Sequence, residues 1–118
     1  MAKVIFLSSD LMFSSRVGGT AKQLNLEIVL VPNGPSLPDK LNADCSLVLV
    51  DMSLDGLNLP AVVRAAKTAA PSAKVVAFGP HVDRAALADA AEAGCDLVLT
   101  RNQFNQQYAE LLKAAAAV

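Results

Sequence analysis

The chain has 118 residues, a length that suits one domain and is too short for two, so residues 1–118 are taken as a single domain. The formal net charge is −1 and the lysines and arginines form no cluster, which argues against nucleic acid and anionic membrane as partners. No apolar run approaches the ~18 residues of a membrane span, and the short apolar start is unlike a signal peptide. We therefore expect a cytoplasmic protein.

Five apolar runs predict the strands of a parallel sheet. Near-continuous apolar runs of this length are typical of strands that are covered on both faces. Helical patterns separate the runs, which implies parallel pairing through right-handed crossovers. The element order and size favour a flavodoxin-like (βα)5 three-layer sandwich, an α/β fold with a five-stranded parallel sheet of order 2-1-3-4-5. The runs cover residues 3–8, 26–31, 45–51, 74–79 and 96–100.

The first two connections give helical signals of different strength. In the first, two glycines, Gly18 and Gly19, interrupt an apolar stripe at helical spacing and indicate a kink or a close approach of another backbone. The second connection is rich in proline, so any helix there must be short and begin near Pro38. The stripe of the first helix consists of Phe13, Val17, Ala21 and Leu24.

The remaining three helices have recognisable ends. Asn58 and Asp83 are predicted N-caps, with Pro60 in the first turn after Asn58. Gly94 is predicted to end the helix that Asp83 begins. The last helix is expected from about Gln103. Its buried side would carry Phe104, Tyr108, Leu111 and Ala115.

The two cysteines, Cys45 and Cys95, are predicted to be reduced packing residues. Each stands at the start of an expected strand, and two strands that flank a third lie roughly 9–10 Å apart. That separation is too long for a disulfide. Their spacing also lacks the CxxC form of a metal site.

Asp51 is the most informative candidate site residue, because it ends the apolar run 45–51. In parallel sheets, ligands gather beyond the carboxyl ends of the strands at the point where the strand order reverses. Asp10 follows the first strand, so both carboxylates are expected in one crevice. Each also has an ordinary structural role open to it: Asp51 as a cap of the following loop and Asp10 as the N-cap of the first helix.

Three features of the chain are those of a known family: the element order, the aspartate that closes the third strand and the Ala93-Gly94 step before the fifth. In these features, nearly the whole chain resembles the receiver domains of bacterial response regulators. The resemblance implies two-component signalling or a phosphorelay, without enzymatic turnover. It implies Asp51 as the phospho-acceptor, Asp10 and Asp51 as ligands of Mg²⁺, and Arg101 as a phosphate-binding cation. A surface salt bridge is the alternative role of Arg101.

The family motif is incomplete in this sequence. Its acidic pair after the first strand falls on Ser9-Asp10, and its hydroxyl residue at the end of the fourth strand falls on Gly79. Its Lys-Pro step falls on Arg101-Asn102, and its aromatic switch position holds Val98. Fewer carboxylates weaken a Mg²⁺ site, and losing one transition-state donor typically costs on the order of 10²–10³ in rate. The pattern therefore indicates a degenerate receiver, or pseudo-receiver.

We expect a protein-interaction or dimerisation module without efficient phosphoryl transfer. Its partner would be a histidine kinase, a downstream effector or a second copy of the chain. Two alternatives stay open: a working phospho-acceptor that uses Asp51 and Mg²⁺, and a flavodoxin-like small-molecule binder. The expected contact face comprises the helix 83–93, the strand 96–100 and the last helix, where receivers pair. Its charged residues are Arg84, Asp89, Glu92, Asp96, Arg101, Glu110 and Lys113.

Overall fold

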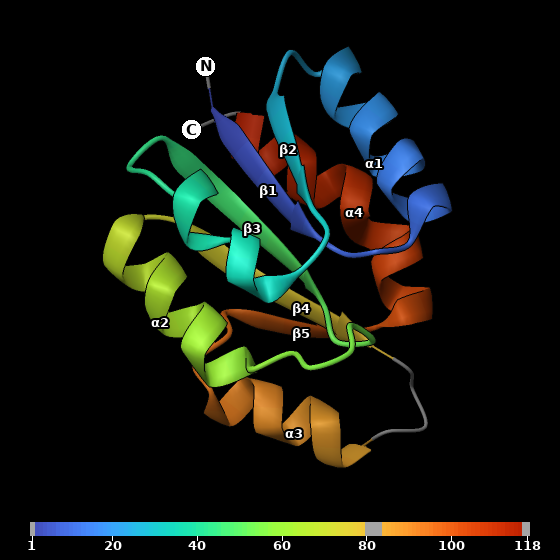
Figure 1. The fold of residues 1–118 in the computed structure, drawn as a ribbon. Helices are drawn as coiled ribbons and strands as arrows, with labels where there is room; N and C mark the ends of the chain where they lie inside the picture. Colours follow the sequence, from blue (N-terminus) through green and yellow to red (C-terminus); the bar gives the residue numbers. More distant parts are fainter. Residues whose placement is uncertain (1, 80–83, 117–118) are drawn as a thin grey trace.

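The protein is a five-stranded parallel sheet between two layers of helices, as a computed structural model that describes residues 2–79 and 84–116 shows (Figure 1). The strand order is β2-β1-β3-β4-β5, and each neighbouring pair is parallel. This confirms the flavodoxin-like order, and each predicted strand end lies within one residue of the observed one. The strands are β1 (Lys3–Leu7), β2 (Glu27–Val31), β3 (Cys45–Asp51), β4 (Lys74–Gly79) and β5 (Leu97–Thr100).

Helices cover both faces of the sheet. Two of them, α1 (Leu11–Gln23) and α4 (Arg101–Ala116), lie on one face. The other face carries α2 (Leu59–Ala69), α3 (Arg84–Glu92) and two 3₁₀ turns, η1 (Gly34–Ser36) and η2 (Pro38–Lys40). The second connection is thus as short as its prolines predicted, and η2 begins at Pro38.

The predicted helix ends are confirmed at α2 and at the end of α3. The Asn58 side chain accepts a hydrogen bond from the Ala61 amide at 3.2 Å, with Pro60 in the first turn. Gly94 follows α3 with a φ of +100°, a conformation that favours glycine. The other predicted cap, Asp83, lies outside the described residues.

Two predictions about the helices were wrong. Helix α1 runs through Gly18 and Gly19, and a Cβ at either position would meet nothing within 4 Å. Helix α4 begins at Arg101 because Thr100 and Gln103 form a capping box. The Gln103 amide donates to Thr100 Oγ1 at 3.1 Å, and the Thr100 amide donates to Gln103 Oε1 at 2.9 Å. On the buried side of α4, Leu112 is fully buried and Leu111 only partly.

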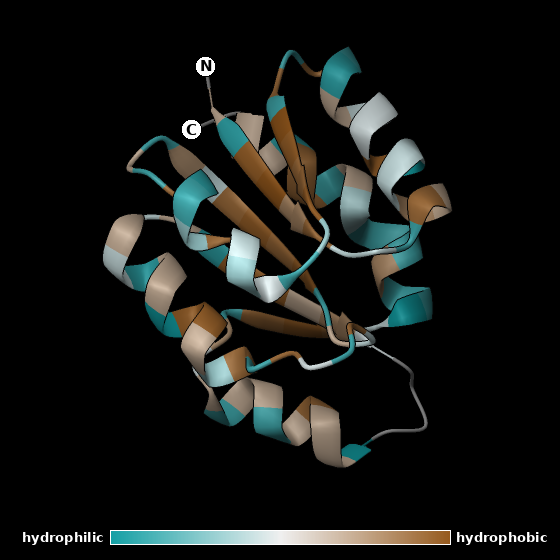
Figure 2. Cartoon of the chain, in the orientation of Figure 1, coloured by the Kyte–Doolittle hydropathy of each residue, from teal (hydrophilic) through white to brown (hydrophobic). Residues whose placement is uncertain are grey.

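All four phenylalanines of the chain pack together between the sheet and the helices α1 and α4. Phe78 and Phe104 stack with ring centroids 4.0 Å apart and an interplanar angle of 7°. Phe6 and Phe13 contact both of these rings. The cluster ties β1, β4, α1 and α4 to one another, and Figure 2 shows how the strands carry continuous apolar sequence beneath it.

Cys45 is buried and Cys95 is half-buried, and both are free thiols, as predicted. Burial raises the pKa of the Cys95 thiol, which keeps it protonated and unreactive near neutral pH. Among the residues that the structure describes, no helix is long and apolar enough to cross a membrane.

Replacing Phe104 by alanine is expected to lower the free energy of unfolding by about 3–5 kcal/mol, because it leaves a cavity among the other three phenylalanine rings. The matched control is Gln107→Ala, an exposed position on the same helix, which should change stability by less than about 0.5 kcal/mol. Urea denaturation followed by circular dichroism measures both. A loss below about 1 kcal/mol for Phe104→Ala would contradict the central role of the cluster.

Candidate functional site

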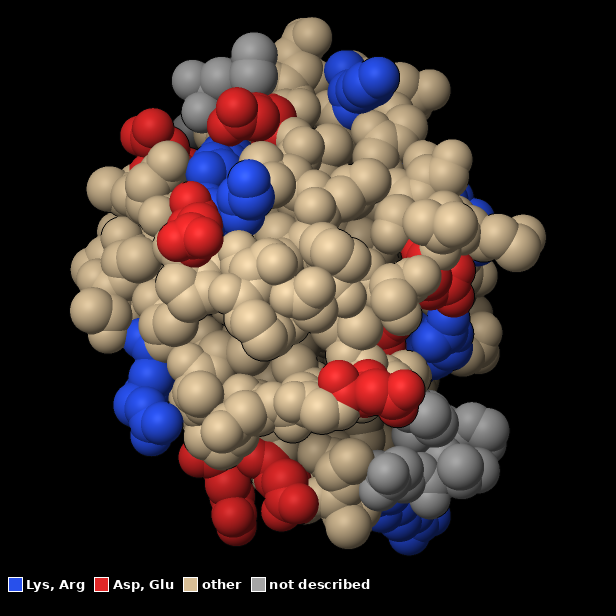
Figure 3. Space-filling view, viewed as in Figure 1, with Lys and Arg blue, Asp and Glu red and all other residues tan. Residues whose placement is uncertain are grey.

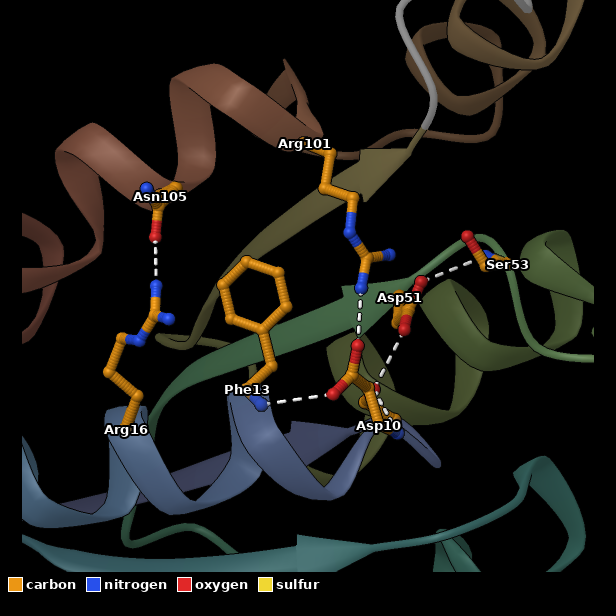
Figure 4. A network of polar contacts seen from close by, with 8 residues as sticks. Asp10, Phe13, Arg16, Asp51, Ser53, Arg101 and Asn105 are labelled. Carbon is orange, nitrogen blue, oxygen red and sulfur yellow. Dashed lines mark hydrogen bonds and ion pairs between the residues drawn. The ribbon is translucent and has the colours of Figure 1, made fainter.

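Asp51 ends β3 at the carboxyl edge of the sheet, and its residue surface is only 3% exposed. Its carboxylate accepts two hydrogen bonds from the chain, shown in Figure 4. The Ser8 hydroxyl donates to Asp51 Oδ2 at 2.7 Å, and the Ser53 amide donates to Asp51 Oδ1 at 2.9 Å. Asp51 therefore caps the following loop, which is the structural role that the sequence left open.

Ser8, and not Ser9, is the hydroxyl residue beside Asp51. Ser8 is buried one position after β1, and its amide donates to the Val31 carbonyl oxygen at 3.0 Å. Its Oγ also accepts a hydrogen bond from the Asp10 amide at 3.1 Å. Ser9 is exposed. The sequence comparison placed the family's acidic pair at residues 9 and 10, but it could not show which serine side chain points towards Asp51. That depends on the backbone direction after β1.

Asp10 and Arg101 form an ion pair between the first turns of α1 and α4. Asp10 Oδ1 accepts the Phe13 amide at 3.0 Å and so caps α1, while Oδ2 accepts from the Arg101 guanidinium. The guanidinium carbon lies 4.8 Å from the centroid of the Phe13 ring, within the range of a cation–π contact. In Figure 4, Arg101 reaches down beside this ring towards Asp10, with Asp51 next to the pair.

These contacts set the charge of Asp10. The hydrogen bond from the Phe13 amide, together with the positive charge and hydrogen bond of Arg101, holds the pKa of the Asp10 carboxyl below its ordinary value. Partial burial opposes this and does not outweigh it. Asp10 is thus a carboxylate at neutral pH, and its charge is balanced within the chain.

The carboxylates of Asp10 and Asp51 have partners within the chain, an arrangement unlike an open Mg²⁺ site. Each of the four carboxylate oxygens of Asp10 and Asp51 already accepts a hydrogen bond from the chain. Mg²⁺ needs near-octahedral oxygen ligands, and here the guanidinium of Arg101 already supplies positive charge to Asp10. No group of three or more His, Cys, Asp or Glu side chains within residues 2–79 and 84–116 is placed to hold a metal.

The place of the family's hydroxyl at the end of β4 is filled by Met52. A Cβ added to Gly79 would lie 3.0 Å from Met52 Cε and 3.3 Å from Met52 Cβ. The backbone of Met52 is held beside β4, because its amide donates to the Phe78 carbonyl oxygen at 2.9 Å. Val98, at the family's aromatic position, packs against the core cluster on the α2 and α3 face.

The charged residues predicted for a contact face have different environments. Arg84, Asp89 and Glu92 are exposed along α3. Asp96 accepts from Lys67 Nζ at 2.5 Å and from the Val75 amide at 2.7 Å, so it links α2 to the starts of β4 and β5. On α4, Glu110 pairs with Lys113 at 3.3 Å, whereas Arg101 turns away to Asp10.

The ion pair of Asp10 gives a testable pH dependence. A lowered pKa in the folded state means that the ionised carboxylate stabilises the fold above the unfolded pKa, near 4, and that this stabilisation is lost as the pH falls through the lowered value. Asp10→Asn keeps the capping oxygen and removes the charge. The stability difference between the two proteins should be constant above about pH 5 and shrink below about pH 4. Urea denaturation from pH 7 to acid measures it; a difference independent of pH would refute the pairing.

The contact between Gly79 and Met52 is also testable. Gly79→Ala is expected to lower stability by about 1 kcal/mol, because the new methyl group meets Met52 at both Cε and Cβ. In a Met52→Ala background the same change should cost much less. Thermal and urea denaturation of the four proteins form a double-mutant cycle. Additive effects would mean that Met52 does not fill the space above Gly79.

No family model and no curated protein matches this chain, but solved structures of response regulators match it over its whole length. A receiver domain from Clostridium thermocellum has a TM-score of 0.78 at 16% identity, covering 99% of this chain and 95% of that one. The BeF3-activated DrrB receiver domain has a TM-score of 0.77 at 22% identity, with the same coverage. A response regulator from Burkholderia pseudomallei, with a phosphorylated aspartic acid and a calcium ion, has a TM-score of 0.76 at 13% identity, covering 99% and 74%. The chain thus has the fold of response-regulator receiver domains.

Proposed function

We propose that the chain is a degenerate receiver module of two-component signalling, which acts through protein contacts without efficient phosphoryl transfer. The observation that carries the proposal is the internal pairing of the two aspartates at the carboxyl edge of the sheet, Asp10 and Asp51. Asp10 is held by Arg101 and Asp51 is held by Ser8, so the groups that a receiver would present to a metal and a phosphoryl donor are engaged by the chain itself.

The chemistry of phosphoryl transfer makes this pairing costly to undo. The reaction needs a free nucleophilic carboxylate, a metal ion that neutralises phosphoryl charge and donors on the phosphoryl oxygens. Here Asp51 would have to give up the Ser8 hydroxyl, and Arg101 could reach a phosphoryl group only by leaving Asp10 unpaired. Gly79 supplies no hydroxyl, and Met52 fills the space where one would stand.

The partner that we propose is another signalling protein, either a histidine kinase or a downstream effector. Exposed and mixed charges on α3 and α4, including Arg84 and the Glu110–Lys113 pair, are suited to setting the specificity of such a contact. We assign no enzymatic turnover to the module. We also propose a cytoplasmic location, because both cysteines are unpaired thiols.

Intact-mass spectrometry after incubation with a small-molecule phosphodonor and Mg²⁺ tests the proposal. We expect no phosphoryl adduct on the wild type under conditions that fully modify a phosphorylatable receiver in a parallel reaction. Asp51→Asn is the matched control, since it keeps the size of the side chain and removes the nucleophile. A single adduct on the wild type that is absent from Asp51→Asn would overturn the proposal and make the chain a working phospho-acceptor.

A further inference from the structure

A broad groove opens on the face of the molecule opposite to α1 and α4. It lies between the loop that follows β3 and the helices α2 and α3, and its volume is about 1130 Å³. Sites for small molecules typically measure about 300–1,000 Å³ and enclose their ligand. This groove is larger and open to one side, so a polypeptide surface suits it better than a small molecule.

The lining of the groove combines apolar and acidic groups. Half-buried apolar side chains form its inner surface, among them Leu54, Leu57 and Ala93. Three acidic residues line it, Asp55, Asp89 and Glu92, against one basic residue, Arg64. Figure 3 shows acidic side chains on both sides of the hollow, at the level of the loop and along α3. An occupant should therefore be apolar in part and positively charged.

The exposed side of α1 has this chemistry. Leu11 is 83% exposed and Met12 is 78% exposed, and they are two of the three large hydrophobic residues with exposed side chains in the described part of the chain. The third, Leu30, is half exposed at the neighbouring sheet edge and pairs with Phe6, on the sheet face that α1 covers. Helix α1 also contains Arg16, Lys22 and no acidic residue.

The charges of the two surfaces form no ion pair among the described residues, and Arg16 donates a hydrogen bond to the neutral Asn105 side chain at 2.6 Å. The ion pairs among the described residues join Lys67 to Asp96, Arg101 to Asp10 and Lys113 to Glu110. None of them uses a charge from the groove or from the exposed side of α1. Asp96 and Arg101, which the sequence placed on a contact face, are instead engaged within the chain.

We infer that the groove between α2 and α3 binds helix α1 of a second copy of this chain, with Met12 and Leu11 entering the groove and Arg16 and Lys22 facing its acidic residues. Groove and helix lie on opposite faces of the sheet, so the contact is head-to-tail and continues from copy to copy as a ring or an open chain. The inference rests on the proposed role as an interaction module.

Sedimentation velocity over a range of concentrations tests the head-to-tail contact. The wild type should associate further as its concentration rises. Met12→Glu places a negative charge on the binding side of α1, and Glu92→Lys places a positive charge in the groove. Each should weaken association about tenfold or more, which corresponds to a loss of about 1.4 kcal/mol of binding free energy. Both positions are exposed, so both variants should fold, as circular dichroism checks.

Mixing the two variants is the decisive experiment. Met12→Glu keeps an intact groove and Glu92→Lys keeps an intact α1 surface, so an equimolar mixture should form dimers and nothing larger. If the interface were symmetric, mixing would not restore association. Gln107→Lys, at an exposed position on α4 outside both surfaces, should associate like the wild type. A monomeric wild type, a mixture that stays monomeric beside an associating wild type, or single variants that associate normally would each overturn the inference. Phosphoryl transfer is read separately by mass, so a failure here leaves that result unaffected.

Discussion

The ion pair between Asp10 and Arg101 organises the carboxyl edge of the sheet. It joins the first turns of α1 and α4, and the Phe13 ring supports the guanidinium from the side. One carboxylate therefore serves as a helix cap and as the partner of an internal cation. A buried or half-buried carboxylate must find compensating charge or hydrogen bonds, and here the chain supplies both. A metal ion is not needed for that purpose.

Ser8 and Met52 follow the same physical pattern, in which a side chain at the carboxyl edge of the sheet contacts the protein itself. The Ser8 hydroxyl satisfies the Asp51 carboxylate. The Met52 side chain closes the space above Gly79. Each of these side chains satisfies a polar group or fills a volume, which stabilises the fold at this edge.

The sequence predicted the sheet because the strands and their order follow from local apolar patterns. It predicted the place of Asp51 because this residue ends one of the apolar runs. The hydrogen bond from Ser8 to Asp51 depends on the direction that the chain takes after β1, which the sequence does not reveal. The sequence comparison therefore drew attention to Ser9 and not to Ser8. The position of Met52 above Gly79 depends on packing between neighbouring strands. The capping box of Thr100 and Gln103 was readable from the sequence, since Thr-x-x-Gln is a start signal for a helix, and it would have placed Arg101 in the first turn.

Under the proposed function, residues of the chain occupy the place that a metal ion would take in a receiver site. A titration of the isotopically labelled protein with Mg²⁺, followed by the backbone amide resonances of Asp10, Met52 and Ser53, tests it most directly. The account predicts that adding Mg²⁺ moves these resonances neither in the wild type nor in Asp51→Asn. Saturable shifts of the same amides in the wild type, lost in Asp51→Asn, would show that Mg²⁺ displaces the internal contacts and would contradict the account.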